Sequence, residues 1–105
     1  RLDHVWITNC HCPIHITRAD SVEVTASILD GASVPVMIAN TRARFFGNVI
    51  EGTGADFDDI GGGIDADIAG NYYGGDAPRL ATADESQFTG ADDVLAEPPA
   101  GAGPR

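Results

Sequence analysis

The sequence predicts an all-β fold, in which short strands wind into a solenoid of about three to four coils followed by an irregular acidic tail. The stretch RFFGNVIEG at 44–52 returns as DIAGNYYGG at 67–75. Apolar residues also alternate with polar ones along short segments, with the period of two that is typical of strands. This pattern stops after residue 77, so we expect coils over 1–77 and an irregular or covering tail over 78–105.

The repeated unit has the same parts in each copy. VEVTASILDG (22–31) aligns with ARFFGNVIEG (43–52) at an offset of 21, and VWITNCHCP (5–13) aligns with VEVTASILD (22–30) at an offset of 17. Each copy starts with a strand, and we expect its alternate residues to point inward: Val5/Ile7, Val22/Val24, Ala43/Phe45 and Ala66/Ile68. A small polar or thiol residue follows (Cys10, Ser27, Asn48, Asn71), and then a second inward residue (Cys12, Leu29, Ile50, Tyr73). Further strands lie at 14–16 and 36–38.

A unit of about 20 residues made of short strands cannot bury its apolar face alone, so neighbouring copies must cover it. In these features the sequence resembles the right-handed parallel β-helix, or pectin-lyase-like, superfamily, over residues 4–75. Coils of that superfamily often stack asparagine at one tight turn, as Asn48 and Asn71 would here. The resemblance implies a parallel fold and, in many members, cleavage or rearrangement of polysaccharides on an outward face. A small antiparallel β-sandwich is the alternative, because short alternating strands predict it as well.

Charge and length narrow the function classes. The chain has 105 residues, enough for one domain, and a net charge of −10. Residues 51–105 hold twelve of the sixteen acidic residues, and there is no lysine. Phosphate neutralisation by Lys and Arg underlies nucleic-acid binding, so we exclude that partner. No apolar run is long enough for a membrane span. The composition is typical of a secreted or cell-surface bacterial protein.

The ends of the predicted solenoid need partners. Nothing before Leu2 resembles a cap, so we expect the first coil to stack on further β-helix coils, from the same precursor or from another subunit. Residues 79–96 are either a covering segment or a tether, and the Pro/Gly/Ala segment 97–105 is expected to be flexible.

An outward row follows from the same alignment. It consists of Trp6, Glu23, Arg44 and Asp67, at the position between the two inward residues of each strand. As a carbohydrate site, Glu23 and Asp67 would be proton donor or base, Arg44 would orient the substrate, and Trp6 would offer a face to a sugar ring. Tyr72 and Tyr73 would serve as a further sugar platform or as a cap. As a purely structural feature, the same row is a surface salt-bridge ladder.

Metal sites are the remaining candidates. CHCPIH at 10–15 contains ligands suited to zinc, but alternation points Cys10 and Cys12 inward, so we favour core cysteines with free thiols. Gly52-x-Gly54-x-Asp56 recurs as Gly61-x-Gly63-x-Asp65, similar to the calcium-binding nonapeptide of repeats-in-toxin proteins. Calcium at Asp56, Asp58 and Asp65 is therefore possible, with a flexible acidic loop as the alternative, and no cofactor is required.

Two functions remain open. The first is a C-terminal fragment or subunit of a secreted carbohydrate-active β-helix protein, acting as a polysaccharide hydrolase, lyase or transferase. The second is a structural or adhesive β-helix, such as a phage tail or surface module, in which the outward row is only a ladder. The first expectation rests on what the superfamily commonly does, and sequence alone does not separate the two.

Overall fold

The computed structural model of the chain describes residues 1–32, 34–52, 57–59, 64–74, 88–90 and 92–105. These residues form strands and connections, and none of them belongs to a helix long and apolar enough to cross a membrane. The strands are β1 (Leu2–Asp3), β2 (Trp6–Thr8), β3 (Ile14–Thr17), β4 (Ser21–Thr25), β5 (Ile28–Ala32), β6 (Val36–Ala39), β7 (Thr41–Phe46), β8 (Val49–Gly52), β9 (Phe57–Asp59), β10 (Ile64–Asp67), β11 (Tyr72–Tyr73) and β12 (Phe88–Thr89).

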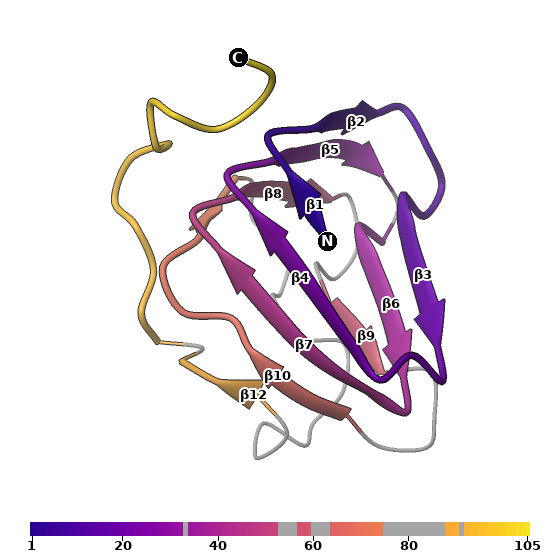
Figure 1. Cartoon of the computed structure of the whole chain (residues 1–105). Helices are drawn as coiled ribbons and strands as arrows, with labels where there is room; N and C mark the ends of the chain where they lie inside the picture. Colours follow the sequence, from indigo (N-terminus) through magenta and orange to yellow (C-terminus); the bar gives the residue numbers. More distant parts are fainter. Residues whose placement is uncertain (33, 53–56, 60–63, 75–87, 91) are drawn as a thin grey trace.

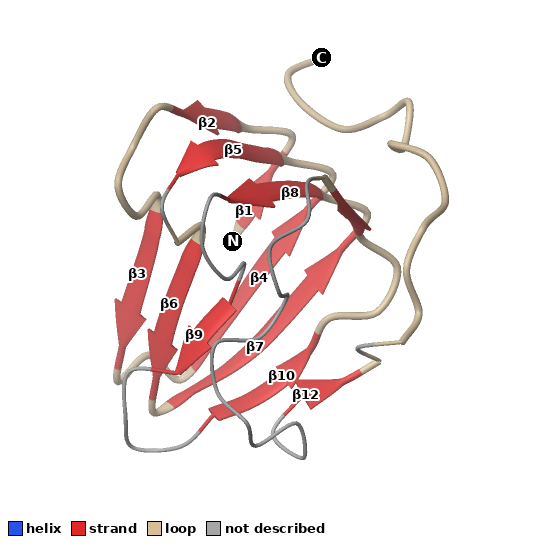
Figure 2. Cartoon of the chain, turned by 180° about the vertical axis from the view of Figure 1, so that it is seen from behind, coloured by secondary structure: helices blue, strands red, loops and turns tan. Residues whose placement is uncertain are grey.

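The strands form three parallel sheets (Figures 1 and 2). Sheet A has the order β1-β4-β7-β10-β12, sheet B has β11-β8-β5-β2, and sheet C has β3-β6-β9. Consecutive strands therefore lie in different sheets, and one repeated unit consists of three strands, for example β4, β5 and β6, after which β7 returns to sheet A. All pairs between the described strands are parallel, which confirms an all-β fold with parallel strands and excludes the antiparallel β-sandwich.

The corners between sheets are made by single residues with positive φ. Between sheets A and B these are His4, Ala26, Gly47 and Gly70, with φ of 57°, 49°, 69° and 77°. One residue in the left-handed region turns an extended chain sharply, and only glycine adopts it without steric cost. The chain is thus bent at the same place in successive units, so that the strands after each corner are in register.

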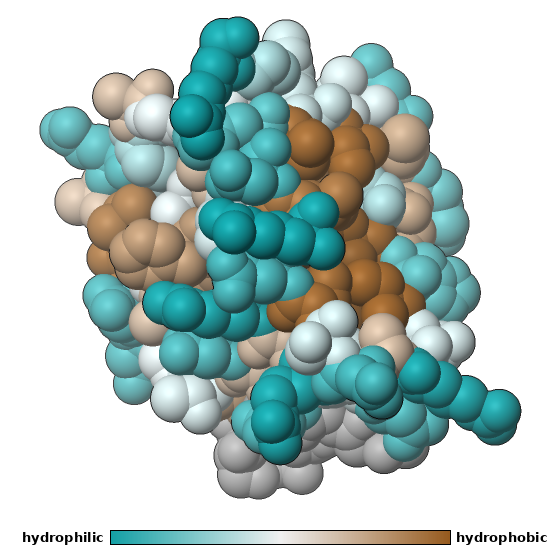
Figure 3. All heavy atoms as spheres, viewed as in Figure 1, coloured by the Kyte–Doolittle hydropathy of each residue, from teal (hydrophilic) through white to brown (hydrophobic). Residues whose placement is uncertain are grey.

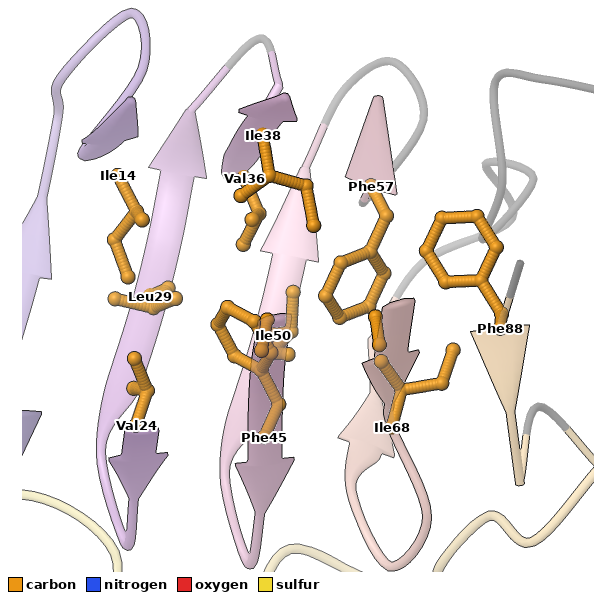
Figure 4. Packing of buried hydrophobic residues seen from close by; sticks show 12 residues of the cluster. Ile14, Val24, Leu29, Val36, Ile38, Phe45, Ile50, Phe57, Ile68 and Phe88 are labelled. Carbon is orange, nitrogen blue, oxygen red and sulfur yellow. The ribbon is translucent and has the colours of Figure 1, made fainter. Parts of the chain in front are cut away.

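The core lies between the three sheets (Figure 4). Its largest members are aromatic: the Phe57 ring contacts Phe45 and Phe88 edge-on, with centroids 5.2 and 6.0 Å apart. The predicted inward residues Val24, Phe45 and Ile68 are fully buried. Strict alternation explains this result, since β7 reads buried, exposed, buried, exposed, buried, exposed along its length.

The predicted alignment is right for sheet A and wrong for the first copy. Val22 pairs with Ala43 at the predicted offset of 21. The stretch 5–13, however, does not stack on 22–30, because Trp6 pairs with Ile28 at an offset of 22. The sequence VWIT resembles VEVT in its alternation, but a whole strand, β3, lies between β2 and β4. Alternation alone does not tell which of the three sheets a strand joins.

A row of buried polar residues runs beneath the corner between sheets A and B. Ser27, Asn48 and Asn71 are all fully buried, as the predicted stack requires. The backbone N–H of Ser27 donates to Oδ1 of Asn48 at 2.9 Å, and that of Asn48 donates to Oδ1 of Asn71 at 3.1 Å. Each side chain thus satisfies a backbone donor of the preceding unit, which a buried N–H group needs.

The prediction that Cys10 is the first member of this row is wrong. Cys10 is exposed, and its place is taken by Val5, whose N–H donates to Oγ of Ser27 at 3.1 Å. In the same way Ile7, not Cys12, pairs with Leu29. Both errors follow from the misplaced offset of 17, and the two cysteines lie instead on the connection between β2 and β3. Their thiols are free of disulfide, as expected.

Candidate functional site

Three of the predicted site residues form an outward row on sheet A. Glu23 pairs with Arg44 in β4 and β7, and Arg44 pairs with Asp67 in β10, as the alignment predicted. The side chains of residues opposite one another in a parallel sheet point to the same face, with strands about 4.8 Å apart. The two acids therefore flank one arginine on the surface of the sheet, at about 9.6 Å from each other.

The charges around this row are paired mainly with other neighbours. Nε of Arg1 lies 3.7 Å from Glu23, and Nε of Arg42 lies 3.7 Å from Asp65 in the next row of the sheet. The Arg44 guanidinium lies 5.8 Å from the centroid of the Phe46 ring. No ion pair joins Arg44 to Glu23 or Asp67 in the part of the chain that the structure describes. Arg44 thus has no carboxylate ion-pair partner among the described residues, which leaves its guanidinium able to bind an anionic group.

The structure corrects the position of Trp6. The indole is not beside Glu23 but on the outward face of sheet B, where one row contains Trp6, Ile28, Val49 and Tyr72. This row is apolar throughout, whereas the sheet A row is charged. Trp6 is 58% exposed, and its Nε1 lies 3.4 Å from both carboxylate oxygens of Asp30. Asp30 thus holds the exposed ring against the sheet.

The two tyrosines point in opposite directions, because they are neighbours in one strand. Tyr72 belongs to the outward row of sheet B, and Tyr73 pairs with the buried Ile50. The Tyr73 ring contacts Phe57 with centroids 6.3 Å apart, and its hydroxyl donates to the carbonyl of Ile68 at 3.4 Å. Of the two residues predicted as a sugar platform, only Tyr72 presents itself on the outward face with Trp6.

The predicted metal sites are only partly covered by the described residues. Asp56 and the side chain of Asp58 lie outside them, and Asp65 is exposed on sheet A beside Arg42. Calcium at these residues stays a prediction. Cys10, predicted to point inward, is exposed, and Sγ of Cys12 lies 3.2 Å from the carbonyl of Ile14. Among the described residues no three His, Cys, Asp or Glu side chains come together as a metal site.

A polar cluster that sequence reasoning missed lies at the corner beside Trp6. The Thr25 hydroxyl donates to Oδ1 of Asp3 at 2.7 Å, and Nδ1 of His4 lies 3.0 Å from the same oxygen. Nη2 of Arg105 lies 3.5 Å from Oδ2 of Asp3 and 3.1 Å from Nδ1 of His4. The Thr25 hydrogen bond, followed by that from His4, lowers the pKa of Asp3 below its ordinary 3.8. No pattern in the sequence links residue 105 to residues 3 and 4.

No protein-family model, curated protein or solved structure matches this chain.

Proposed function

We propose that this chain is a segment of a right-handed parallel β-helix similar to those of the pectin-lyase-like superfamily. The support is the regular return of the chain to each sheet, with β4 and β7 paired at an offset of 21 and β7 and β10 at an offset of 23. The buried stack of Asn48 on Asn71 agrees with the turn at which such coils stack asparagine.

We further propose that sheet B binds carbohydrate, and one observation carries this proposal. Trp6 and Tyr72 stand at the two ends of one outward row, three strand spacings or about 14 Å apart, with only Ile28 and Val49 between them. Aromatic rings offer flat apolar faces to sugar rings, and their polar edges can bond to hydroxyl groups. The acidic composition without lysine supports a secreted or cell-surface bacterial protein as part of this proposal.

The charged row of sheet A adds a candidate for catalysis. Glu23 and Asp67 would act as proton donor and base, and Arg44 between them would orient the substrate. Their strands lie two spacings, or about 9.6 Å, apart, and rotation of the side chains can bring the carboxyl groups into the range of about 6.5–9.5 Å that separates acid and base in inverting glycosidases. The backbone N–H of Ala69 donates to Asp67 at 3.2 Å, which fixes that carboxylate on the surface.

The binding test uses the full chain and a panel of soluble bacterial and plant polysaccharides, by isothermal titration calorimetry. Trp6→Ala and Tyr72→Ala should each weaken binding about tenfold, because each removes one stacking face. Phe46→Ala is the matched control, since Phe46 is an exposed aromatic residue of sheet A. If no polysaccharide binds, or if both variants bind like the wild type, the carbohydrate proposal fails.

Catalysis needs a separate assay of reducing ends or of unsaturated products. Glu23→Gln and Asp67→Asn should each abolish turnover, whereas Asp65→Asn, an exposed acid of the neighbouring row, should not. A wild-type rate in both variants would remove these residues from the reaction.

A structural or adhesive β-helix is the second candidate, and the ion pairs of sheet A favour it. Glu23 is already paired with Arg1, and Arg42 with Asp65, both at exposed positions. Two separate, exposed ion pairs of this kind are typical of a solvated surface without a catalytic role. This candidate predicts oligomers and no turnover of any glycan.

We propose further β-helix coils, from the same precursor or another subunit, as the partner of one end of the core. β1, β2 and β3 are each the terminal strand of a sheet. Their apolar residues Leu2, Ile7 and Ile16 are only partly buried. Figure 3 shows an apolar area between polar side chains on this side of the molecule. Sedimentation velocity should detect an assembly at micromolar concentration. A dispersed monomer would contradict this partner.

A further inference from the structure

The C-terminal residues 95–105, here called the strap, run back along the corner between sheets A and B. The strap passes outside the ends of β10 and β7 toward β2 (Figure 1). Its first residue, Leu95, donates its N–H to the carbonyl of Asn71 at 2.8 Å, and Gly103 donates to the carbonyl of Ala26 at 2.7 Å. The strap thus connects the last described unit to the first ones.

Gly103 is the point at which the strap touches sheet B. A Cβ atom at this residue would lie 2.9 Å from Cδ1 of Ile28, and its φ is +93°. The positive φ favours glycine here, and an added Cβ would also force the Ile28 methyl group to move. Ile28 belongs to the apolar row that starts at Trp6. The docked strap therefore covers part of that row.

Where the strap ends, Nδ1 of His4 has two competing partners. Nδ1 of His4 lies 3.1 Å from Nη2 of Arg105 and 3.0 Å from Oδ1 of Asp3. The guanidinium group only donates and the carboxylate only accepts. Nδ1 can accept from Arg105 when it carries no proton, or donate to Asp3 when it does, but it cannot do both at once.

We propose that His4 is a pH-sensitive latch for the strap. In its neutral tautomer with the proton on Nε2, His4 accepts a hydrogen bond from Arg105 at Nδ1, which helps to hold the strap on Ile28. Protonated His4 donates to Asp3 and presents a positive charge to Arg105, which then keeps only its contact with Oδ2 of Asp3, so the docked strap loses stability relative to the released one. Histidine is the side chain whose charge ordinarily changes between pH 5 and 8.

Among the described residues, the charged groups that face His4 are those of Asp3, Arg1 and Arg105. On its own segment it faces Asp3, with Arg1 acting on that carboxylate; β4 contributes the uncharged Thr25 and the strap contributes Arg105. Because the pKa of Asp3 lies below 3.8, this carboxylate stays ionised down to pH 5. Arginine is charged throughout.

Release of the strap would uncover Ile28 beside Trp6 and so lengthen the apolar row. This consequence rests on the proposed carbohydrate-binding function, in which the docked strap weakens binding without abolishing it, because Trp6 stays 58% exposed while the strap is docked. The latch itself is independent of any ligand, and it is tested without one.

The experiment follows the δ1 methyl group of Ile28 by ¹H–¹³C NMR in the full 105-residue chain between pH 7.5 and 5.0. Gly103→Val, which cannot dock, supplies the reference for the released strap. The ratio of docked to released strap should fall about fivefold on acidification, the factor that corresponds to about 1 kcal/mol for one exposed charge contact. The midpoint should coincide with the titration of the His4 ring protons.

Variants separate His4 from the other histidines. His4→Asn keeps an acceptor oxygen and tolerates the positive φ of this position, so its strap should stay docked at both pH values. His15→Asn, at an exposed position of β3, should titrate like the wild type. Arg105→Gln should remove the pH dependence of the ratio, because it removes the cation that protonated His4 repels. This variant tests the latch if His4→Asn does not fold. A pH-independent ratio in the wild type, or an unchanged pH dependence in His4→Asn and Arg105→Gln, would overturn the latch.

Discussion

Asn48 and Asn71 are joined in the interior by a hydrogen bond of 2.9 Å, from Nδ2 of Asn48 to Oδ1 of Asn71. Nδ2 of Asn48 also lies 2.9 Å from the carbonyl of Val24, and Oδ1 accepts from the N–H of Ser27. The Asn48 carboxamide therefore bonds to two backbone groups of the preceding unit and to the Asn71 side chain of the next one. Because water does not reach these atoms, the groups have no other partner if the amide is removed.

Asn48→Asp should destabilise the fold strongly. The carboxylate cannot donate to Val24 or Asn71, and it places a charge among carbonyl oxygens, so we expect a loss of about 3 kcal/mol or more in the free energy of unfolding. Urea denaturation measures it. Asn40→Asp makes the same chemical change at an exposed residue with φ of 51°, and it should shift the free energy by less than about 0.5 kcal/mol. Equal effects of the two substitutions would refute the role of the buried stack.

Gly70→Ala should cost about 2 kcal/mol, because a residue with Cβ pays this much in the left-handed region. The φ of Gly70 is +77°, and the new Cβ would also lie 2.9 Å from Cε2 of Phe46. Gly101→Ala is the control, since nothing lies within 4 Å of its added Cβ. Thermal denaturation should show a lower Tm for the first variant only. A Tm equal to that of the wild type would mean that the corner does not need its glycine.

Phe57→Ala should be among the most damaging core substitutions, at about 3–5 kcal/mol. Its ring contacts the rings of Phe45, Tyr73 and Phe88, so truncation leaves a cavity at the point where all three sheets meet. Phe46→Ala, at a ring that is 52% exposed, should cost about 1 kcal/mol or less. Chemical denaturation of both variants compares them. Similar losses would place Phe57 outside the centre of the core.

Thr25→Val should raise the pKa of Asp3 toward 3.8, because the Thr25 hydroxyl is the largest cause of its lowering. A carboxyl group whose pKa is lower in the folded than in the unfolded state stabilises the fold at pH values above its unfolded-state pKa. This contribution is lost as the pH falls through the folded-state pKa. The wild type should therefore keep the contribution to a lower pH than the variant does. NMR titration of the Asp3 carboxyl carbon measures both pKa values. Thr17→Val, in β3, is the control and should leave the Asp3 titration unchanged; an unchanged titration in Thr25→Val would contradict the assignment.

The candidate site could be predicted in part. The pairing of Glu23, Arg44 and Asp67 follows from alternation and from the aligned stretches 22–31, 43–52 and 67–75, because both are local patterns repeated along the chain. The alignment predicts Trp6 on sheet A, and this prediction is wrong because its strand, which belongs to sheet B, has the same alternation as the strands of sheet A. The aromatic row with Tyr72 became visible only when the register of sheet B was known.

The sequence by itself determined which residues face inward in β4, β7 and β10 and that Asn48 stacks on Asn71. These follow from a period of two and from a spacing that the chain repeats, and both are written in neighbouring residues. Tertiary structure alone decided which sheet each strand joins and where the strap docks. All three sheets share one period, so alternation cannot distinguish them. Arg105 meets His4 across 101 positions of the chain, a contact that depends on the three-dimensional path of the strap and on no local pattern.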